Sequence, residues 1–154
     1  MTDTDVIIVG AGPAGLMLAG ELCLAGVRPL VLEKRPQIHE VPRAGGFSGQ
    51  IVQLLRYRGL LEQFSAAGAR LHDAPQIPFG GLHVDLALTD HRYEAVGFAQ
   101  PKLERLLDIR ATELGAEIRR GHDIVGLHHH DASVSIDVHG PDGPYRMSAR
   151  YVVG

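Results

Sequence analysis

The sequence predicts an α/β fold in which a parallel sheet with a helical crossover is combined with an antiparallel meander. Val6–Val9 and Leu30–Leu32 are short apolar runs, as expected for strands buried on both faces, and a mostly apolar helical pattern separates them. The last third of the chain instead alternates apolar and polar residues with a period of about two. The first pattern is a β-α-β unit of about thirty residues, whose crossover should be right-handed.

The β-α-β unit has clear boundaries. Its helix follows the glycine-rich segment Gly10–Gly15 and is expected to end at Gly26, because glycine enters the left-handed region at little cost. Pro29 is expected to be the first residue of the second strand, where its missing N–H matters least. Glu33 comes directly after that strand.

The middle of the chain is predicted to be less regular. Gln37–Gly46 is expected to be a loop, Phe47–Tyr57 has helical spacing, and Leu60–Phe64 fits a second short helix. The stretch that follows contains prolines and a Gly80-Gly81 pair. These residues predict loops and hairpins with short strands such as Leu82–Leu86.

Regular patterns return after Gln100. Pro101 suits the first turn of a helix that should end at Gly115, and Ala116–Arg119 is expected to be a short strand. A three-stranded meander is predicted next, formed by Ile124–His130, Ser133–His139 and Tyr145–Ala149. Tyr151–Val153 is expected to start another buried strand.

Composition and charge exclude several classes of protein. The 15 Lys and Arg residues against 18 Asp and Glu give a net charge of −3, which argues against a nucleic-acid-binding domain. Cys23 is the single cysteine, so it forms no intramolecular disulfide, and one cysteine does not suffice for a cysteine zinc site. No apolar run approaches the roughly 20 residues that span a bilayer, and the acidic start is unlike a signal peptide. We therefore expect a cytoplasmic protein without a nucleic-acid or membrane partner.

Glycine is the most over-represented residue, with 19 among 154 positions, against a background of about 7%. Three of these glycines form Gly10-x-Gly12-x-x-Gly15 between a predicted strand and a predicted helix, which is the dinucleotide-binding fingerprint of a Rossmann-like parallel sheet. Gly10 permits the tight turn, Gly12 lets the backbone approach a pyrophosphate, and Gly15 lets the helix approach the strand. The helix N-terminus attracts phosphate.

Glu33 narrows the choice of nucleotide. It lies 18 residues beyond Gly15, at the end of the second strand, where a carboxylate can accept a hydrogen bond from a ribose 2′-hydroxyl. The same carboxylate would repel a 2′-phosphate, so NADP is not expected at this fingerprint. FAD and NAD share the adenosine diphosphate half, and the fingerprint does not separate them. The irregular segment after Glu33 favours FAD, because an NAD dehydrogenase half would continue to alternate strands and helices.

The sequence also resembles the class A flavin-dependent monooxygenases, which have the para-hydroxybenzoate hydroxylase fold. It is most similar to the bacterial hydroxylases of aromatic polyketides of the angucycline, anthracycline and tetracycline types. The resemblance covers nearly the whole chain. It rests on Val6–Glu33, Pro42–Phe47, Arg58–Leu60, Phe79–Gly81, Gln100 with Leu103-Glu104, and Leu114–His122.

The resemblance implies a domain spanning residues 1–154 that binds FAD without a covalent bond. The cofactor-binding residues that it implies are Gly10, Ala11, Gly12, Pro13, Ala14, Gly15, Glu33, Lys34, Arg43, Gln100 and Ile124. Arg43 matches an arginine near the pyrophosphate and the flavin, and Gln100 a glutamine near the ribityl chain. Lys34 or Arg35 would flank the adenosine, and the Ile124 backbone would contact the adenine. The alternatives are a solvated charge for Arg43 and Lys34, and a simple cap or turn contact for Gln100.

His128-His129-His130 raises the question of a metal site. On a strand, alternate residues point to opposite sides, so at most His128 and His130 could bind the same ion. No acidic or cysteine partner has a convincing spacing nearby. We therefore predict no metal site and interpret these histidines as a solvated strand surface.

By resemblance, the parent enzyme hydroxylates a phenolic ring of a small aromatic substrate and uses NADPH or NADH to reduce FAD. No catalytic acid or base can be assigned in this chain. Tyr151–Gly154 resembles the segment before the family's Asp-Gly motif, so the sequence is interpreted as the N-terminal portion of such an enzyme. We expect this portion alone to bind FAD weakly and to be inactive. The alternative is an NAD- or FAD-binding module of another oxidoreductase, without turnover of its own.

Overall fold

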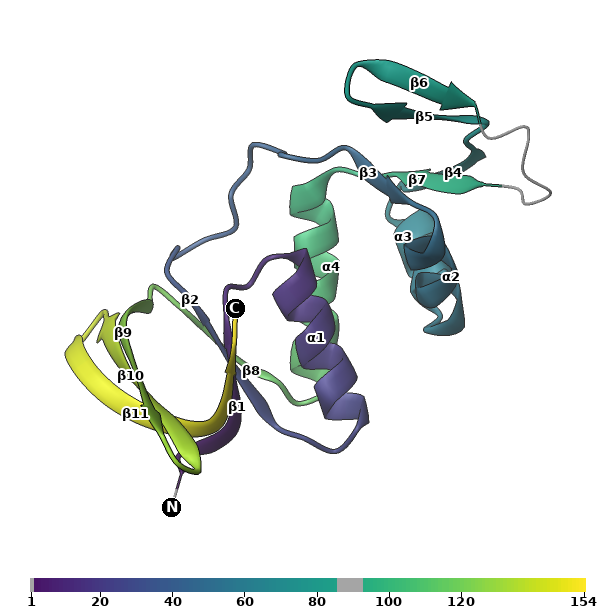
Figure 1. The fold of residues 1–154 in the computed structure, drawn as a ribbon. Coiled ribbons are helices and arrows are strands. Elements are labelled where there is room, and N and C mark those ends of the chain that lie inside the picture. Colours follow the sequence, from purple (N-terminus) through teal and green to yellow (C-terminus); the bar gives the residue numbers. More distant parts are fainter. Residues whose placement is uncertain (1, 86–92) are drawn as a thin grey trace. The chain divides into compact units, whose positions relative to one another are not determined.

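A computed structural model describes residues 2–85 and 93–154 of the chain. The chain forms two compact units, one made of residues 1–40 and 104–154 and the other of residues 41–103. Figure 1 shows the elements of both units in chain order. The expected strand Leu82–Leu86 corresponds to β6 (Leu82–Asp85), and Leu86 lies outside the described residues.

The first unit contains a six-stranded sheet in the order β8-β2-β1-β11-β10-β9. Its strands are β1 (Thr4–Val9), β2 (Pro29–Glu33), β8 (Glu117–Arg120), β9 (Asp123–His130), β10 (Ser133–Gly140) and β11 (Gly143–Val153). The first four strands of that order pair in parallel, and β11, β10 and β9 pair antiparallel. The predicted Rossmann-like parallel sheet and meander are confirmed, and the meander is a continuation of the same sheet.

The helices of the first unit cover one face of the parallel strands (Figure 1). Helix α1 (Pro13–Leu24) connects β1 to β2 and buries Leu16 and Ala19. Gly26, with a φ of 79°, follows the end of this helix, as expected. Helix α4 (Gln100–Glu113) begins in the second unit and enters the first at Glu104, and Gly115 follows its end with a φ of 103°.

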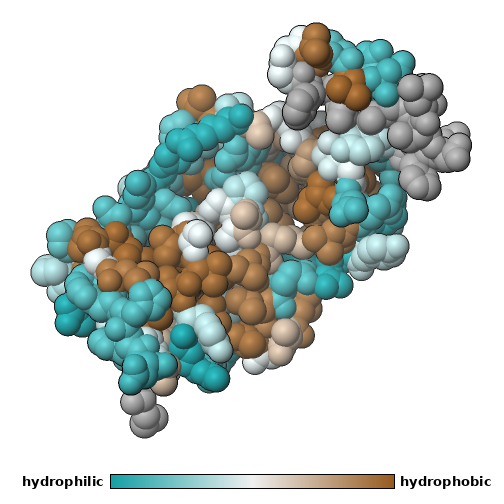
Figure 2. Space-filling view, in the orientation of Figure 1, coloured by the Kyte–Doolittle hydropathy of each residue, from teal (hydrophilic) through white to brown (hydrophobic). Residues whose placement is uncertain are grey.

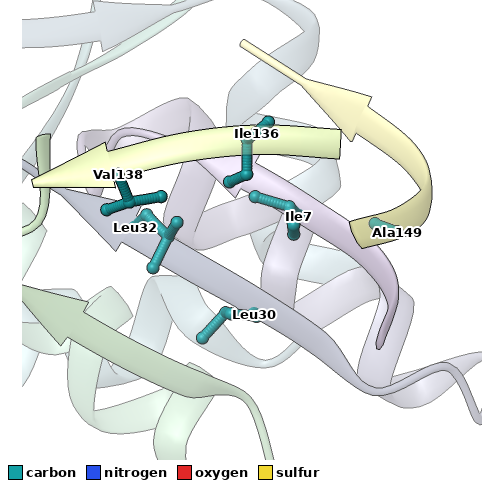
Figure 3. Packing of buried hydrophobic residues seen from close by; sticks show 6 residues of the cluster. All are labelled: Ile7, Leu30, Leu32, Ile136, Val138 and Ala149. Atoms are coloured by element: carbon teal, nitrogen blue, oxygen red, sulfur yellow. The ribbon is translucent and has the colours of Figure 1, made fainter. Parts of the chain in front are cut away.

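The meander covers the opposite face of the parallel strands. Ile7, Leu30 and Leu32 from β1 and β2 form one buried cluster with residues of β10 and β11. Figure 3 shows Ile136 and Val138 of β10 lying over Ile7 and Leu32. β1 and β2 are therefore buried on both faces, which explains why Val6–Ile8 and Leu30–Leu32 are uninterrupted apolar runs.

The second unit has a small antiparallel sheet, β3-β7-β4, and a separate hairpin, β5-β6. Its elements are β3 (Gly46–Ser48), α2 (Gln50–Tyr57), α3 (Leu60–Ala66), β4 (Arg70–Asp73), β5 (Gln76–Phe79), β6 (Leu82–Asp85) and β7 (Glu94–Gly97). The predicted short helix and the hairpin at Gly80-Gly81 are confirmed, and both glycines have positive φ.

Two expectations for the secondary structure are wrong. The helix predicted for Phe47–Tyr57 begins at Gln50, because Gly49 has a left-handed φ of 73° and Phe47 belongs to β3. Tyr151–Val153 does not start a new strand: it is the end of β11, since residues 145–150 contain neither glycine nor proline to interrupt the strand. This end is also less buried than expected, with Tyr151 61% and Val153 42% exposed. Figure 2 shows apolar surface in this part of the first unit.

Candidate cofactor-binding site

The glycine loop (Gly10–Gly15) joins β1 to α1 at the carboxyl end of the parallel strands. Gly10 has a φ of 104°, and its N–H donates to the carbonyl of Leu32 at 2.8 Å. A Cβ at Gly15 would lie 2.1 Å from the carbonyl oxygen of Gly10 and 3.3 Å from the Ile8 side chain. The tight turn predicted for Gly10 and the close helix approach predicted for Gly15 are therefore confirmed.

The N-terminus of α1 is open toward the loop. Gly12 is the N-cap and Pro13 the first helical residue, and the Leu16 N–H donates to the Gly12 carbonyl at 2.9 Å. The N–H groups of Ala14 and Gly15 thus belong to the first turn, where a helix has no acceptor of its own to offer. The first turn carries no acidic residue.

The space around this helix terminus determines whether the phosphates of a cofactor fit there. A Cβ added at Gly10 or Gly12 would meet no atom of the described residues within 4 Å. Space next to the backbone, unpaired N–H groups and the positive end of a helix dipole together suit a pyrophosphate. The residues of the glycine loop therefore fit the phosphate half of a dinucleotide.

Glu33 ends β2 beside the glycine loop, and its half-buried carboxylate has two backbone partners. Oε2 accepts the Ala11 N–H and Oε1 accepts the Arg35 N–H, both at 2.9 Å. The bond to Ala11 was not predicted from the sequence, because nothing local marks a contact between residues 22 positions apart, and the local bond to Arg35 was missed as well. A carboxylate offers about four acceptor positions, so Glu33 retains capacity for ribose hydroxyls while it fixes the loop.

The chain after β8 runs along the same edge of the sheet. The His122 N–H donates to the Glu33 carbonyl at 3.0 Å, and the Gly121 N–H to the Arg35 carbonyl at 3.3 Å. Ile124 follows two residues later and packs, half-buried, against the core cluster. Lys34 is exposed. The structure therefore brings the segment containing Ile124 to the end of β2, and leaves the Lys34 side chain in solvent.

Arg43 and Gln100 lie together in the second unit. Arg43 is exposed, and its backbone N–H donates to Oε1 of Gln100 at 3.3 Å. Gln100 is half-buried at the first position of α4. Arg43 and Gln100 are 57 positions apart in the sequence and were predicted as two independent cofactor residues. The hydrogen bond between them was not predicted.

The three consecutive histidines lie on β9, as predicted. His128 Nε2 is 2.7 Å from Asp137 Oδ2, and His130 Nε2 is 3.0 Å from Ser135 Oγ. Asp137 also accepts from Arg146 Nε at 2.7 Å, and these two partners lower the pKa of its carboxyl to about 2. The acidic partner was missed because it is a cross-strand neighbour on β10. Within the described ranges, no three His, Cys, Asp or Glu side chains are grouped as a metal site requires.

None of the helices in the described part of the chain is both long and apolar enough to cross a bilayer.

Comparison with known families and proteins gives a consistent result. The sequence model of the family described as "FAD binding domain" matches residues 3–154. The chain is 43% identical over 151 residues to the 12-dehydrotetracycline 5-monooxygenase/anhydrotetracycline 6-monooxygenase of Streptomyces rimosus, covering 97% of this chain and 30% of that protein. The chain thus spans about a third of the length of such curated relatives.

Solved structures agree with the family match. CabE, an aromatic hydroxylase from angucycline biosynthesis, superposes with a TM-score of 0.87 at 41% identity, over 99% of this chain and 31% of that one. Aklavinone-11 hydroxylase, solved in a ternary complex with FAD and aklavinone, superposes with a TM-score of 0.78 at 30% identity, over 100% of this chain and 33% of that one.

Proposed function

This chain belongs to the family of FAD-binding domains, and from that premise we propose that it is the FAD-holding part of an NAD(P)H-dependent monooxygenase that hydroxylates a small aromatic substrate of the polyketide type. FAD is its cofactor. The observation that carries the proposal is the glycine loop, with its open helix N-terminus next to the Glu33 carboxylate. The substrate class is supported by the similarity to the tetracycline monooxygenase and to the angucycline hydroxylase CabE.

Each predicted cofactor residue has a role in this proposal. The N–H groups between Gly10 and Gly15 bind the pyrophosphate. Glu33 binds the adenosine ribose, and the Ile124 backbone contacts the adenine, with Lys34 at the edge of the adenosine. Arg43 holds phosphate oxygens with its planar guanidinium and lies near the flavin. Gln100 lies near the ribityl chain.

In this proposal the bound flavin supplies the electron transfer and the activation of oxygen, and NADPH or NADH supplies the electrons. The residues of this chain bind the adenosine diphosphate half and orient the flavin. Binding and positioning are the roles that we assign to these residues. Such a protein works in the cytoplasm, where its reductant is available.

The direct test is to identify the bound nucleotide. We expect the purified protein to bind added FAD, and ADP at the same site, with NAD bound less tightly and NADP least, because Glu33 faces the position of a 2′-phosphate. Titration calorimetry with the four nucleotides gives this order. Retention of NAD with no affinity for FAD would instead support the alternative of a binding module from another oxidoreductase.

A second measurement tests the reaction. In the holoenzyme we expect NADPH or NADH oxidation that is stimulated by a phenolic polyketide, with one oxygen atom added to the product as seen by mass spectrometry. FAD binding without any such stimulation across aromatic substrates would contradict the monooxygenase part of the proposal and leave the cofactor part intact.

A further inference from the structure

We propose that Gln100 is a positioning residue for Arg43: its side-chain carbonyl fixes the loop from which the Arg43 guanidinium reaches the cofactor. This inference rests on the proposed function, in which Arg43 binds the pyrophosphate. It concerns the arginine loop (Arg43–Gly46) and the turn that joins β7 to α4, and both lie in the second unit.

The arginine loop is a continuation of the β3–β7 ladder. The last regular pair of that ladder is Gly46 with Gly97. Beyond it, the Phe98 N–H donates to the Gly45 carbonyl at 2.9 Å, and the Gln100 N–H to the Ala44 carbonyl at 3.4 Å. The two segments therefore stay side by side up to the residue that follows Arg43.

The base of the loop allows no extra atom. A Cβ at Gly46 would lie 2.3 Å from the carbonyl oxygen of Val96 and 3.3 Å from the Cα of Gly97. Both atoms belong to the backbone, so they cannot rotate away as a side chain could. The close approach of the two segments thus depends on glycine at position 46.

Three aromatic rings pack the arginine loop and the β7–α4 turn against the core of the second unit. Phe64 of α3 is fully buried and contacts Phe47 edge-on at 6.5 Å between ring centroids and Phe98 in a stacked arrangement at 5.6 Å. Phe47 directly follows Gly46, and Phe98 directly follows Gly97. The core of the second unit therefore anchors one residue of each segment, Phe47 after the arginine loop and Phe98 in the segment that faces it.

The Gln100 side chain extends this series of contacts to Arg43 itself. Oε1 of Gln100 accepts the Arg43 N–H at 3.3 Å, one residue beyond the last backbone bond. A guanidinium gains most from two phosphate oxygens when its geometry is set before binding, because ordering a flexible side chain reduces affinity. Gln100 contributes to this order by fixing the backbone from which the arginine side chain starts.

The two roles conceivable for Gln100, direct ligand and positioning residue, predict different variant behaviour. Gln100→Leu removes the acceptor and keeps the approximate volume, and we expect about fivefold weaker FAD binding, as for the loss of one hydrogen bond. Gln100→Glu keeps an acceptor for the Arg43 N–H, and we expect binding within about twofold of the wild type. In an Arg43→Ala background, Gln100→Leu should change FAD affinity no further, because its effect passes through Arg43.

A measurement on the protein without cofactor completes the test. We expect faster hydrogen exchange at the Arg43 amide in Gln100→Leu and near wild-type exchange in Gln100→Glu, with unchanged circular dichroism and Tm in both. A full additional loss of affinity in the Arg43→Ala background, or unchanged Arg43 exchange in Gln100→Leu, would overturn the proposal. Absence of FAD binding to the wild type would instead contradict the proposed function, and the exchange measurement would still decide whether Gln100 holds Arg43.

Discussion

The glycine loop and the arginine loop are built on the same plan but are fixed to different degrees. In each, one glycine sits where a backbone carbonyl oxygen excludes a side chain, and one distant side chain accepts a backbone N–H of the loop. Glu33 accepts the Ala11 N–H at 2.9 Å with a charged oxygen, whereas Gln100 accepts the Arg43 N–H at 3.3 Å with a neutral one. Bonds to a charged group contribute about twice as much as neutral ones. The glycine loop is therefore preformed, and the arginine loop is the more adjustable of the two.

The largest expected effect is at the position with the least space. Gly15→Ala places a Cβ 2.1 Å from the Gly10 carbonyl oxygen, and we expect a loss of about 3 kcal/mol in the free energy of unfolding, measured by urea denaturation. Gly12→Ala is the matched control, because it lies in the same loop with open space around it and an ordinary φ of −78°.

For Gly12→Ala we expect nearly unchanged stability but weaker FAD and ADP binding, since the added methyl group occupies the space proposed for the pyrophosphate. Equal destabilisation by the two substitutions would show that the close contact at Gly15 does not distinguish these positions. Equal FAD affinity for Gly12→Ala and wild type would contradict the proposal that the pyrophosphate binds at this loop.

The same contrast can be made in the arginine loop. Gly46→Ala would place a Cβ 2.3 Å from the Val96 carbonyl oxygen, and we expect a loss of about 2 kcal/mol in unfolding free energy. Gly45→Ala, with no described atom within 4 Å of its Cβ, should leave stability within about 0.5 kcal/mol. A smaller effect than at Gly15 is expected because the β3 strand is short and its exposed end can shift. Similar losses of unfolding free energy for Gly15→Ala and Gly46→Ala would contradict the proposed difference in rigidity between the two loops.

How far the sequence predicts these two loops depends on the range of the contacts. The conformation of the glycine loop was predicted because its strand, its three glycines and its helix are consecutive in the sequence. The β3 strand was taken for the start of a helix, because its pairing with β7 joins Phe47 to Val96 and no local pattern reveals that partner. The bonds from Glu33 and Gln100 to loop N–H groups were missed for the same reason. The glycine motif and the family resemblance suggested which side chains to assign to the site, and tertiary packing determined what they contact.

Glu33 offers a test of the charged acceptor. Glu33→Gln keeps one oxygen but turns an N–H group toward one of the two backbone N–H groups, at Ala11 or Arg35. We expect a loss of about 1.5 kcal/mol in unfolding free energy, together with weaker ADP binding and a smaller preference for NAD over NADP. Thermal unfolding and nucleotide titration measure the two effects. Glu117→Gln is the matched control, because Glu117 is an exposed glutamate that forms an ion pair with Arg119. A stability loss confined to the nucleotide-bound protein would show that the backbone bonds of Glu33 do not fix the loop.

The smallest effect is expected on the meander, away from both loops, at Asp137. Arg146 and His128 lower the pKa of this carboxyl from its usual 3.8 to about 2, so the ionised form is favoured in the folded state. The stability that this provides is fully present above the unfolded pKa and is lost as the pH falls from about 4 toward 2. Asp137→Asn should therefore lower Tm slightly at pH 7, and the difference from the wild type should shrink toward zero near pH 2. Because the carboxylate is in contact with solvent, salt should weaken the effect.

FAD affinity and Arg43 amide exchange should not change, since the substitution removes a cross-strand ion pair and no loop contact. A Tm difference that persists at pH 2 would mean that the asparagine disturbs the β9–β10 pairing itself, where the bulge beside Asp137 already interrupts the register.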